Sequence, residues 1–238
     1  MPAQCLDDHS LRRHGGGKLI RWSRSAARNY LAALHFSPQD IAGYFQRLGC
    51  VQYDPLKPVG RNVDLVFQSR LADYRVDQWE QAVYGTAPRS YYDAWDKQAC
   101  VVPVSDWPER RLYHAYFDGI WRPRVLAPYP EAVEKVEGTI RERGPSSAAD
   151  LADLDLPGSD DGGREGSWFG PRLLNHVLKA LWFTGRLVTH HRKNGRHVYA
   201  PADAVVPAEI LARPPAPPEK TLEWLVLRRH QSAGLLRP

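Results

Sequence analysis

The feature that most limits the possible fold is a β-hairpin signal that follows a series of helical patterns. Lys193-Asn194-Gly195 separates two short stretches, 187–191 and 196–200, that read as strands. Asn-Gly is the favoured centre of a type I′ turn, because both of its positions need a positive φ. Apolar spacing predicts helices before this hairpin over 131–143, 148–154 and 171–183. Three helices followed by a hairpin are the plan of a winged helix-turn-helix module.

A second helical region lies in the N-terminal half. Its first helix is expected from about Ser25 to Phe36. Ser37 then has the place of an N-cap, Pro38 of a first-turn proline and Asp40 of the acid three positions on, for a helix that Gly49 ends. Two short helices joined by a tight turn suit a helix-turn-helix.

The chain between these two regions carries weaker signals. Residues 51–56 alternate apolar and polar side chains as a brief strand would, and 62–70 is the next extended candidate. A helix is expected over 76–84, and an aromatic, irregular stretch follows from Tyr91 to Trp121. Prolines at 123, 128 and 130 mark a plausible module boundary.

These patterns predict an α+β protein, mainly helical, with tandem winged helix-turn-helix modules and short β-hairpins. A length of 238 residues suits one large unit or two modules. The expected parts are a flexible tail (1–20), a first winged-helix-like module (21–130), a second winged helix (131–205), and a Pro-rich linker with the start of an incomplete third module (206–238). An amphipathic helix expected over 221–236 either packs back on the second module or needs a partner surface.

Basic residues concentrate in the second module. The formal net charge of +5 is too small to identify a partner by itself. Between Arg172 and Arg196, however, the chain has six Lys or Arg residues and no carboxylate, and this segment covers the third helix and the hairpin. These are the elements with which a winged helix contacts DNA. We therefore expect phosphate contacts from Arg172, Lys179, Arg192, Lys193 and Arg196, while a solvated face used for protein contacts is the alternative.

The cysteines give no sign of a metal site. Cys5, Cys50 and Cys100 lie far apart and lack the spacing of zinc ligands, so buried or idle thiols are expected. The sequence shows no secretory leader and no apolar run of the roughly 20 residues that cross a bilayer. A cytoplasmic protein without a metal, a membrane or a cofactor is expected, and a monomer is the default.

Three motifs in order resemble the AlkZ/YcaQ-type DNA glycosylases. They are Leu48-Gly-Cys-Val-Gln52-Tyr53-Asp54-Pro-Leu, Asp64-Leu-Val-Phe-Gln-Ser-Arg70-Leu and Tyr92-Asp-Ala-Trp95-Asp-Lys-Gln-Ala. That family consists of winged-helix proteins that remove alkylated purines from DNA, and its catalytic centre is a Gln-apolar/aromatic-Gln or Gln-apolar/aromatic-Asp tripeptide. The resemblance implies that Gln52-Tyr53-Asp54 is the Asp-bearing version. Some members carry a His where this chain has Lys97, so the role of position 97 stays open.

The chemistry of base removal suits these residue types. A purine alkylated at N7 or N3 leaves as a neutral base, so the reaction needs a negative group near the oxocarbenium sugar and a positioned water. Residues two apart in a strand share a side, which lets Gln52 and Asp54 point together while Tyr53 turns inward. Taken alone, a Q-x-D tripeptide is weak evidence, since Asp54 before Pro55 is also an ordinary turn opener.

Further site residues are expected on weaker grounds. Arg61 and Arg70 are candidates for phosphate contacts near the lesion, with salt bridges as the alternative. Tyr53, Tyr92 and Trp95 are candidates for a lesion pocket, with core packing as the alternative.

Two classes of function follow. The first is a monofunctional DNA N-glycosylase that acts on N7- or N3-alkylated purines, crosslinked ones included, in double-stranded DNA. The second is a winged-helix DNA-binding or regulatory protein without chemistry.

Overall fold

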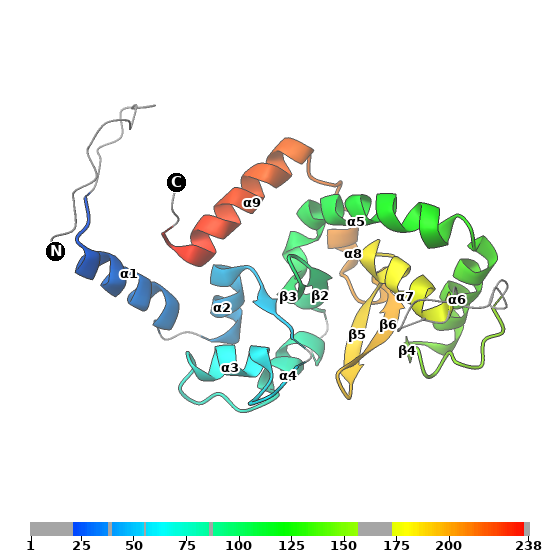
Figure 1. Ribbon diagram of the computed structural model, residues 1–238, viewed down its shortest axis with the longest axis horizontal. Helices are drawn as coiled ribbons and strands as arrows, with labels where there is room; N and C mark the ends of the chain where they lie inside the picture. The colour runs from blue at the N-terminus through cyan, green and yellow to red at the C-terminus, as the bar shows by residue number, and fades with distance from the viewer. Residues whose placement is uncertain (1–20, 38–39, 55, 86–87, 157–172, 236–238) are drawn as a thin grey trace, which may run out of the picture.

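Two small antiparallel sheets of three strands each, surrounded by helices, organise the chain (Figure 1). The computed structural model describes residues 21–37, 40–54, 56–85, 88–156 and 173–235. The tail predicted over 1–20 and Arg172 therefore lie outside the described residues. The mainly helical α+β class expected from the sequence is confirmed.

The first sheet has the strand order β1-β3-β2 and lies among the N-terminal helices. In chain order the elements are α1 (Arg24–Phe36), α2 (Ile41–Leu48), β1 (Val51–Gln52), α3 (Asn62–Gln68), α4 (Gln78–Tyr84), β2 (Tyr91–Trp95), β3 (Ala99–Pro103) and α5 (Trp107–Trp121). Gly49 ends α2 in the left-handed region, as predicted. The N-cap of that helix is Asp40, whose carboxylate accepts from the backbone N–H of Gly43, and not Ser37.

Two sequence-based expectations in this half are wrong. Residues 62–68 form α3 instead of an extended segment, because Val63 and Phe67, four residues apart, bury the same face. The aromatic stretch is not irregular but forms the β2–β3 hairpin and the long helix α5. Its aromatic side chains fill cores on both sides of the sheet, so no simple alternation of apolar and polar residues was visible.

The second sheet has the order β4-β6-β5 and carries the predicted hairpin. In chain order the elements are a π-helical segment (Arg122–Leu126), α6 (Pro130–Arg143), β4 (Ser146–Ser147), α7 (Leu173–Phe183), β5 (Leu187–Lys193), β6 (Arg196–Pro201), α8 (Ala208–Leu211) and α9 (Pro218–Ala233). Asn194 and Gly195 have φ of 53° and 76°, which confirms the type of turn expected. The helix predicted over 148–154 is wrong. The Asp150 carboxylate accepts from the backbone and hydroxyl of Ser147, which holds this segment in turns.

A shared core joins the two halves. Tyr92, Val102 and Trp107 of the first half pack in one buried cluster with Val188 and Ala200 of the second sheet. Helix α5 runs along the molecule and contacts both α7 and α9 (Figure 1). The module boundary at about residue 130 stays a prediction.

Helix α9 packs against the first half, whereas packing on the second module or on a partner surface was expected. Its Arg228 and Arg229 pair with Asp106 and Asp96, and the helix contacts α2 and α5. In the described part of the chain, each helix is too short or too polar to cross a membrane.

Candidate catalytic segment and nucleic-acid interface

The Gln52-Tyr53-Asp54 segment lies at the edge of the first sheet with its side chains on alternating sides. Val51 and Tyr53 are buried, whereas Gln52 is exposed and Asp54 is half-buried. The backbone N–H of Tyr53 donates to Ala99 O at 2.8 Å, which continues the pairing of β1 with β3. Burial therefore alternates along the segment, with Tyr53 in the core and with Gln52 and Asp54 accessible to solvent.

Two polar residues that the sequence did not single out hold Gln52. Its side-chain Nε2 donates to Oε1 of Gln98 at 2.8 Å. Its backbone carbonyl accepts from Nδ2 of Asn62, also at 2.8 Å. Gln98 lies in the turn between β2 and β3. Its contact with Gln52 could not be predicted from the sequence, because the stretch that forms this hairpin was expected to be irregular.

Among the described residues, the Asp54 carboxylate has one local partner and no neutralising cation. Its Oδ1 accepts from the backbone N–H of Leu56 at 2.9 Å, which is the turn geometry expected of an Asp in this position. No Lys or Arg within the described ranges forms an ion pair with Asp54. The negative charge is therefore available to a positively charged group that approaches from solvent.

Tyr53, directly after β1, lies between the first half and the hairpin of the second sheet. The Arg192 guanidinium lies over the Tyr53 ring, 3.7 Å from its centroid. The same guanidinium pairs with Asp93 of β2 at 2.6 Å, and the side chains of this pair are only 3% and 1% exposed. Tyr84 donates to the other Asp93 oxygen at 2.7 Å. Burial, with Asp93 beside it, raises the pKa of Tyr84 well above its ordinary value, so the phenol remains a donor.

The predicted DNA contact by Arg192 is therefore wrong. Its charge is buried and neutralised by Asp93, so it joins the hairpin to the first sheet instead of facing solvent. In the sequence Arg192 stands among basic neighbours, and no pattern there indicates Asp93, 99 residues away, as its partner.

Arg61 and Arg70 are likewise engaged within the protein. Arg61 forms salt bridges with the carboxylates of Asp64, Asp77 and Glu80, which was the alternative to a phosphate contact. Arg70 lies over the rings of Tyr44 and Phe36 and donates to Val66 O. Arg61 is therefore not free to contact a phosphate in this conformation. Arg70 is half-buried and pairs with no carboxylate of the described residues, so its phosphate contact stays a prediction.

Three of the predicted DNA contacts are exposed. They are Lys179 on α7, and Lys193 and Arg196 on either side of the hairpin turn. None of the three forms an ion pair with a carboxylate of the described residues. Exposed and unpaired cations on a helix and an adjacent hairpin are suited to phosphate contacts.

A cleft of about 1050 Å³ opens beside the hairpin. Tyr53 and Ala99 line one part of it, and Arg196 and His197 line another. Burial, with Arg192 nearby, lowers the pKa of His197 to about 4, so this imidazole is neutral at physiological pH. Neither Gln52 nor Asp54 lines the cleft.

The expected lesion pocket is not formed by its three residues together. Tyr53 lines the cleft, although it is only 5% exposed. Tyr92 is 1% exposed and packs against Trp107, as the core alternative describes. Trp95 is half-buried and packs edge-to-face against Phe117 and Phe183. Tyr92 and Trp95 both line a cavity of only about 20 Å³, which is too small for a purine.

A comparison with family models identifies the family of the chain. The model of the DNA glycosylase AlkZ-like family matches residues 45–238, which includes the Gln52-Tyr53-Asp54 segment, both sheets and α9. The protein thus belongs to a class of enzymes that act on the N-glycosidic bonds of DNA. In particular, the chain belongs to the AlkZ-like family of DNA glycosylases. Searches of curated proteins and of solved structures gave no match.

Proposed function

We propose that this protein is a monofunctional DNA glycosylase that hydrolyses the N-glycosidic bond of N7- or N3-alkylated purines in double-stranded DNA. The observation that carries the proposal is an exposed Gln52 at the end of an edge strand, followed two residues later by a solvent-accessible Asp54 carboxylate that no cation of the described residues neutralises. Membership in a DNA glycosylase family supports it.

The chemistry follows from the charge of the substrate. An alkylated purine carries a positive charge and leaves as a neutral base, so no strong general acid is needed. Positive charge develops on the deoxyribose as the bond breaks, and the Asp54 carboxylate stabilises it because no cation of the described residues competes for that charge. Asp54 also accepts the proton of the attacking water, and Gln52 orients that water or the sugar by hydrogen bonds.

The neighbouring residues make Gln52 a rigid donor and acceptor. Gln98 and Asn62 bind its side chain and its backbone, so the amide is oriented before the substrate arrives. Because Gln52 is exposed and the large cleft does not include it, we propose that the lesion reacts at an open surface and not in a deep pocket. An open surface also suits bulky or crosslinked purines.

The duplex is held by the second sheet and its helix. We propose that the helix, strand, helix and hairpin order of residues 130–201 acts as a winged helix, in which Lys179, Lys193 and Arg196 contact phosphates. Lys97 is exposed in the β2–β3 turn, next to the residue that binds Gln52, and we assign it a phosphate contact near the lesion.

The test is release of N7-methylguanine from a duplex that contains it, measured for the wild-type chain, Asp54→Asn and a matched control, Asp73→Asn. Asp73 is an exposed aspartate away from the segment. The proposal predicts base release by the wild type and the control, and its loss in Asp54→Asn with duplex binding retained. Sequence-preferring binding without release in any of the three proteins would identify a DNA-binding protein without chemistry.

A further inference from the structure

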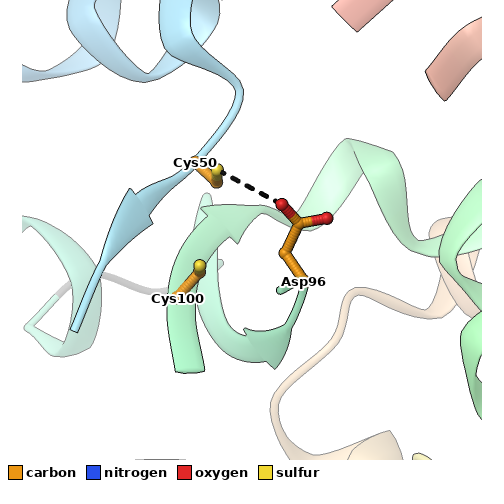
Figure 2. A group of neighbouring side chains, drawn as sticks. All are labelled: Cys50, Asp96 and Cys100. Carbon is orange, nitrogen blue, oxygen red and sulfur yellow. Dashed lines mark hydrogen bonds between the residues drawn. The ribbon is translucent and has the colours of Figure 1, made fainter. Parts of the chain in front are cut away.

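Two cysteines and an aspartate that are far apart in the sequence meet beside the catalytic strand. Cys50 immediately precedes β1, Cys100 lies on β3, and Asp96 lies in the turn between β2 and β3. Figure 2 shows the three side chains gathered between the start of β1 and this hairpin. One ligand atom from each residue lies within 4.8 Å of the other two. The Cys50 Sγ is 3.9 Å from Asp96 Oδ2.

The Cys50–Asp96 separation is close to that expected in a tetrahedral metal site. With Zn–S of about 2.3 Å and Zn–O of about 2.1 Å, two ligands of a tetrahedral zinc ion lie about 3.6 to 3.8 Å apart. The Cys50 to Asp96 distance differs from this by a few tenths of an ångström. A disulfide would require the two sulfur atoms to approach to about 2.05 Å. Cys50 and Cys100 are diagonal neighbours across β1 and β3 and do not face each other directly.

Asp96 is already oriented as a metal-binding carboxylate is. Tyr113 donates to its Oδ1 at 3.1 Å, and Arg229 donates to its Oδ2 at 2.6 Å. A carboxylate oxygen has two lone pairs, so Oδ2 can accept from Arg229 and still coordinate an ion. Hydrogen bonds of this kind to a ligand's outer atoms fix its orientation in metal sites.

The surrounding charges favour an anionic set of ligands. Two thiolates and a carboxylate with one divalent ion carry a net charge of −1, and Arg110 and Arg229 both line the small cavity next to Cys50 and Asp96. Arg110 is 4% exposed, and its Nε has no hydrogen-bond acceptor among the described residues. A thiolate or an ion-bound water would provide one. The cavity itself measures about 20 Å³, enough for one water as a fourth ligand.

We propose that Cys50, Asp96 and Cys100 form a binding site for a thiophilic divalent ion, Zn²⁺ being the best match. The ion joins the start of β1 to the β2–β3 hairpin. Its ligand Cys50 lies two residues before Gln52, and its ligand Asp96 lies two residues before Gln98, which binds the Gln52 side chain. The ion therefore stabilises the strand that presents the catalytic pair. The site does not depend on the proposed glycosylase reaction. Sequence spacing concealed it because its ligands come from positions 50, 96 and 100.

The experiment is a titration of the reduced, full-length protein with Co²⁺, followed by displacement with Zn²⁺. A thiolate-to-cobalt charge-transfer band shows that sulfur binds the ion, and tetrahedral d–d bands show the coordination geometry. Histidines elsewhere in the chain cannot produce the thiolate band. The expected result is one such ion per chain. Cys50→Ala and Asp96→Asn weaken binding, the Cys variant on the order of 100-fold or more, and Tyr113→Phe weakens it about 10-fold.

Cys5→Ala is the matched control and keeps the wild-type affinity. Cys50 is half-buried and small, so Cys50→Ala is expected to fold, and its circular dichroism spectrum checks this. The test therefore does not depend on Cys100→Ala, a change at a buried position. Absence of a saturable thiolate band in the wild type overturns the proposal. So does a Cys50→Ala protein that binds as tightly as the wild type, or a Cys50–Cys100 disulfide that persists under reducing conditions in place of ion binding.

Discussion

Replacing Arg192 with alanine separates a structural role from a DNA-binding role. The Arg192–Asp93 pair is almost completely buried, so removing the cation leaves an uncompensated carboxylate inside the protein. Breaking a buried pair in this way costs about 3–5 kcal/mol. The contact of the guanidinium with the Tyr53 ring is lost as well. Since a folded protein is stable by only about 5–15 kcal/mol, this is a large fraction of the whole.

The assay is urea or thermal unfolding followed by tryptophan fluorescence. At about 2–4 °C per kcal/mol for a chain of this size, Arg192→Ala should lower the melting temperature by roughly 6–20 °C. Arg196→Ala is the matched control, because Arg196 is an exposed cation on the same hairpin. That variant should change stability by no more than about 0.5 kcal/mol. It should instead reduce the slope of log affinity for DNA against log salt by about 1.

The opposite pattern would refute this reasoning. If Arg192→Ala unfolds at the wild-type temperature and loses DNA affinity with a reduced salt slope, Arg192 contacts phosphate and its burial against Asp93 is not the state that binds DNA. Asp93→Asn gives an independent check. It should destabilise the protein as well, because it leaves the buried guanidinium without its counter-ion.

Three further predictions concern stability. Gly185→Ala should lower the free energy of unfolding by more than about 1–2 kcal/mol, because φ is +72° and a Cβ there would lie 2.6 Å from the His114 ring; a denaturation midpoint equal to wild type would contradict this. The pKa of His197 is about 4 in the folded protein against 6.5 in the unfolded chain, so its contribution to the free energy of unfolding is present above pH 6.5 and falls by about 3 kcal/mol as the pH drops to 4. The free energy of unfolding, measured by urea titration at several pH values in this range, should depend less on pH for His197→Gln than for the wild type. Asp40→Ala should cost about 1 kcal/mol in a urea titration, because the N-cap bond to Gly43 is lost, and no change would mean that the α2 cap is dispensable.

Local chemistry made the second sheet predictable. The Asn194-Gly195 turn, the helix over 173–183 and the apolar strands each carry their own signal, and the structure places all of them where the sequence suggested. The short segment after β4 escaped, because the hydrogen bonds from Ser147 to Asp150 compete with a helix that composition alone favours. A side-chain bond of this kind leaves no periodic pattern.

Features of the candidate site that depend on neighbouring residues in the sequence were predictable, whereas contacts between distant segments were not. Alternation in a strand was enough to predict that Tyr53 is buried while Gln52 and Asp54 are accessible to solvent. The roles of Gln98 and Asp93 depend on which strands pair and which sheets pack, so no local pattern could give them. The same reason explains the error for Arg192, whose partner became known only from the packing of the two sheets.

The most direct test of the catalytic claim is whether Gln52 and Asp54 act as one unit. Single-turnover release of N7-methylguanine should be measured for Gln52→Ala, Asp54→Asn and the double variant, with duplex affinity checked for each by fluorescence anisotropy. Groups that act on one transition state are not additive, so the double variant should lose scarcely more activity than Asp54→Asn alone. Losses that add in full, or base release that persists in Asp54→Asn, would contradict the account.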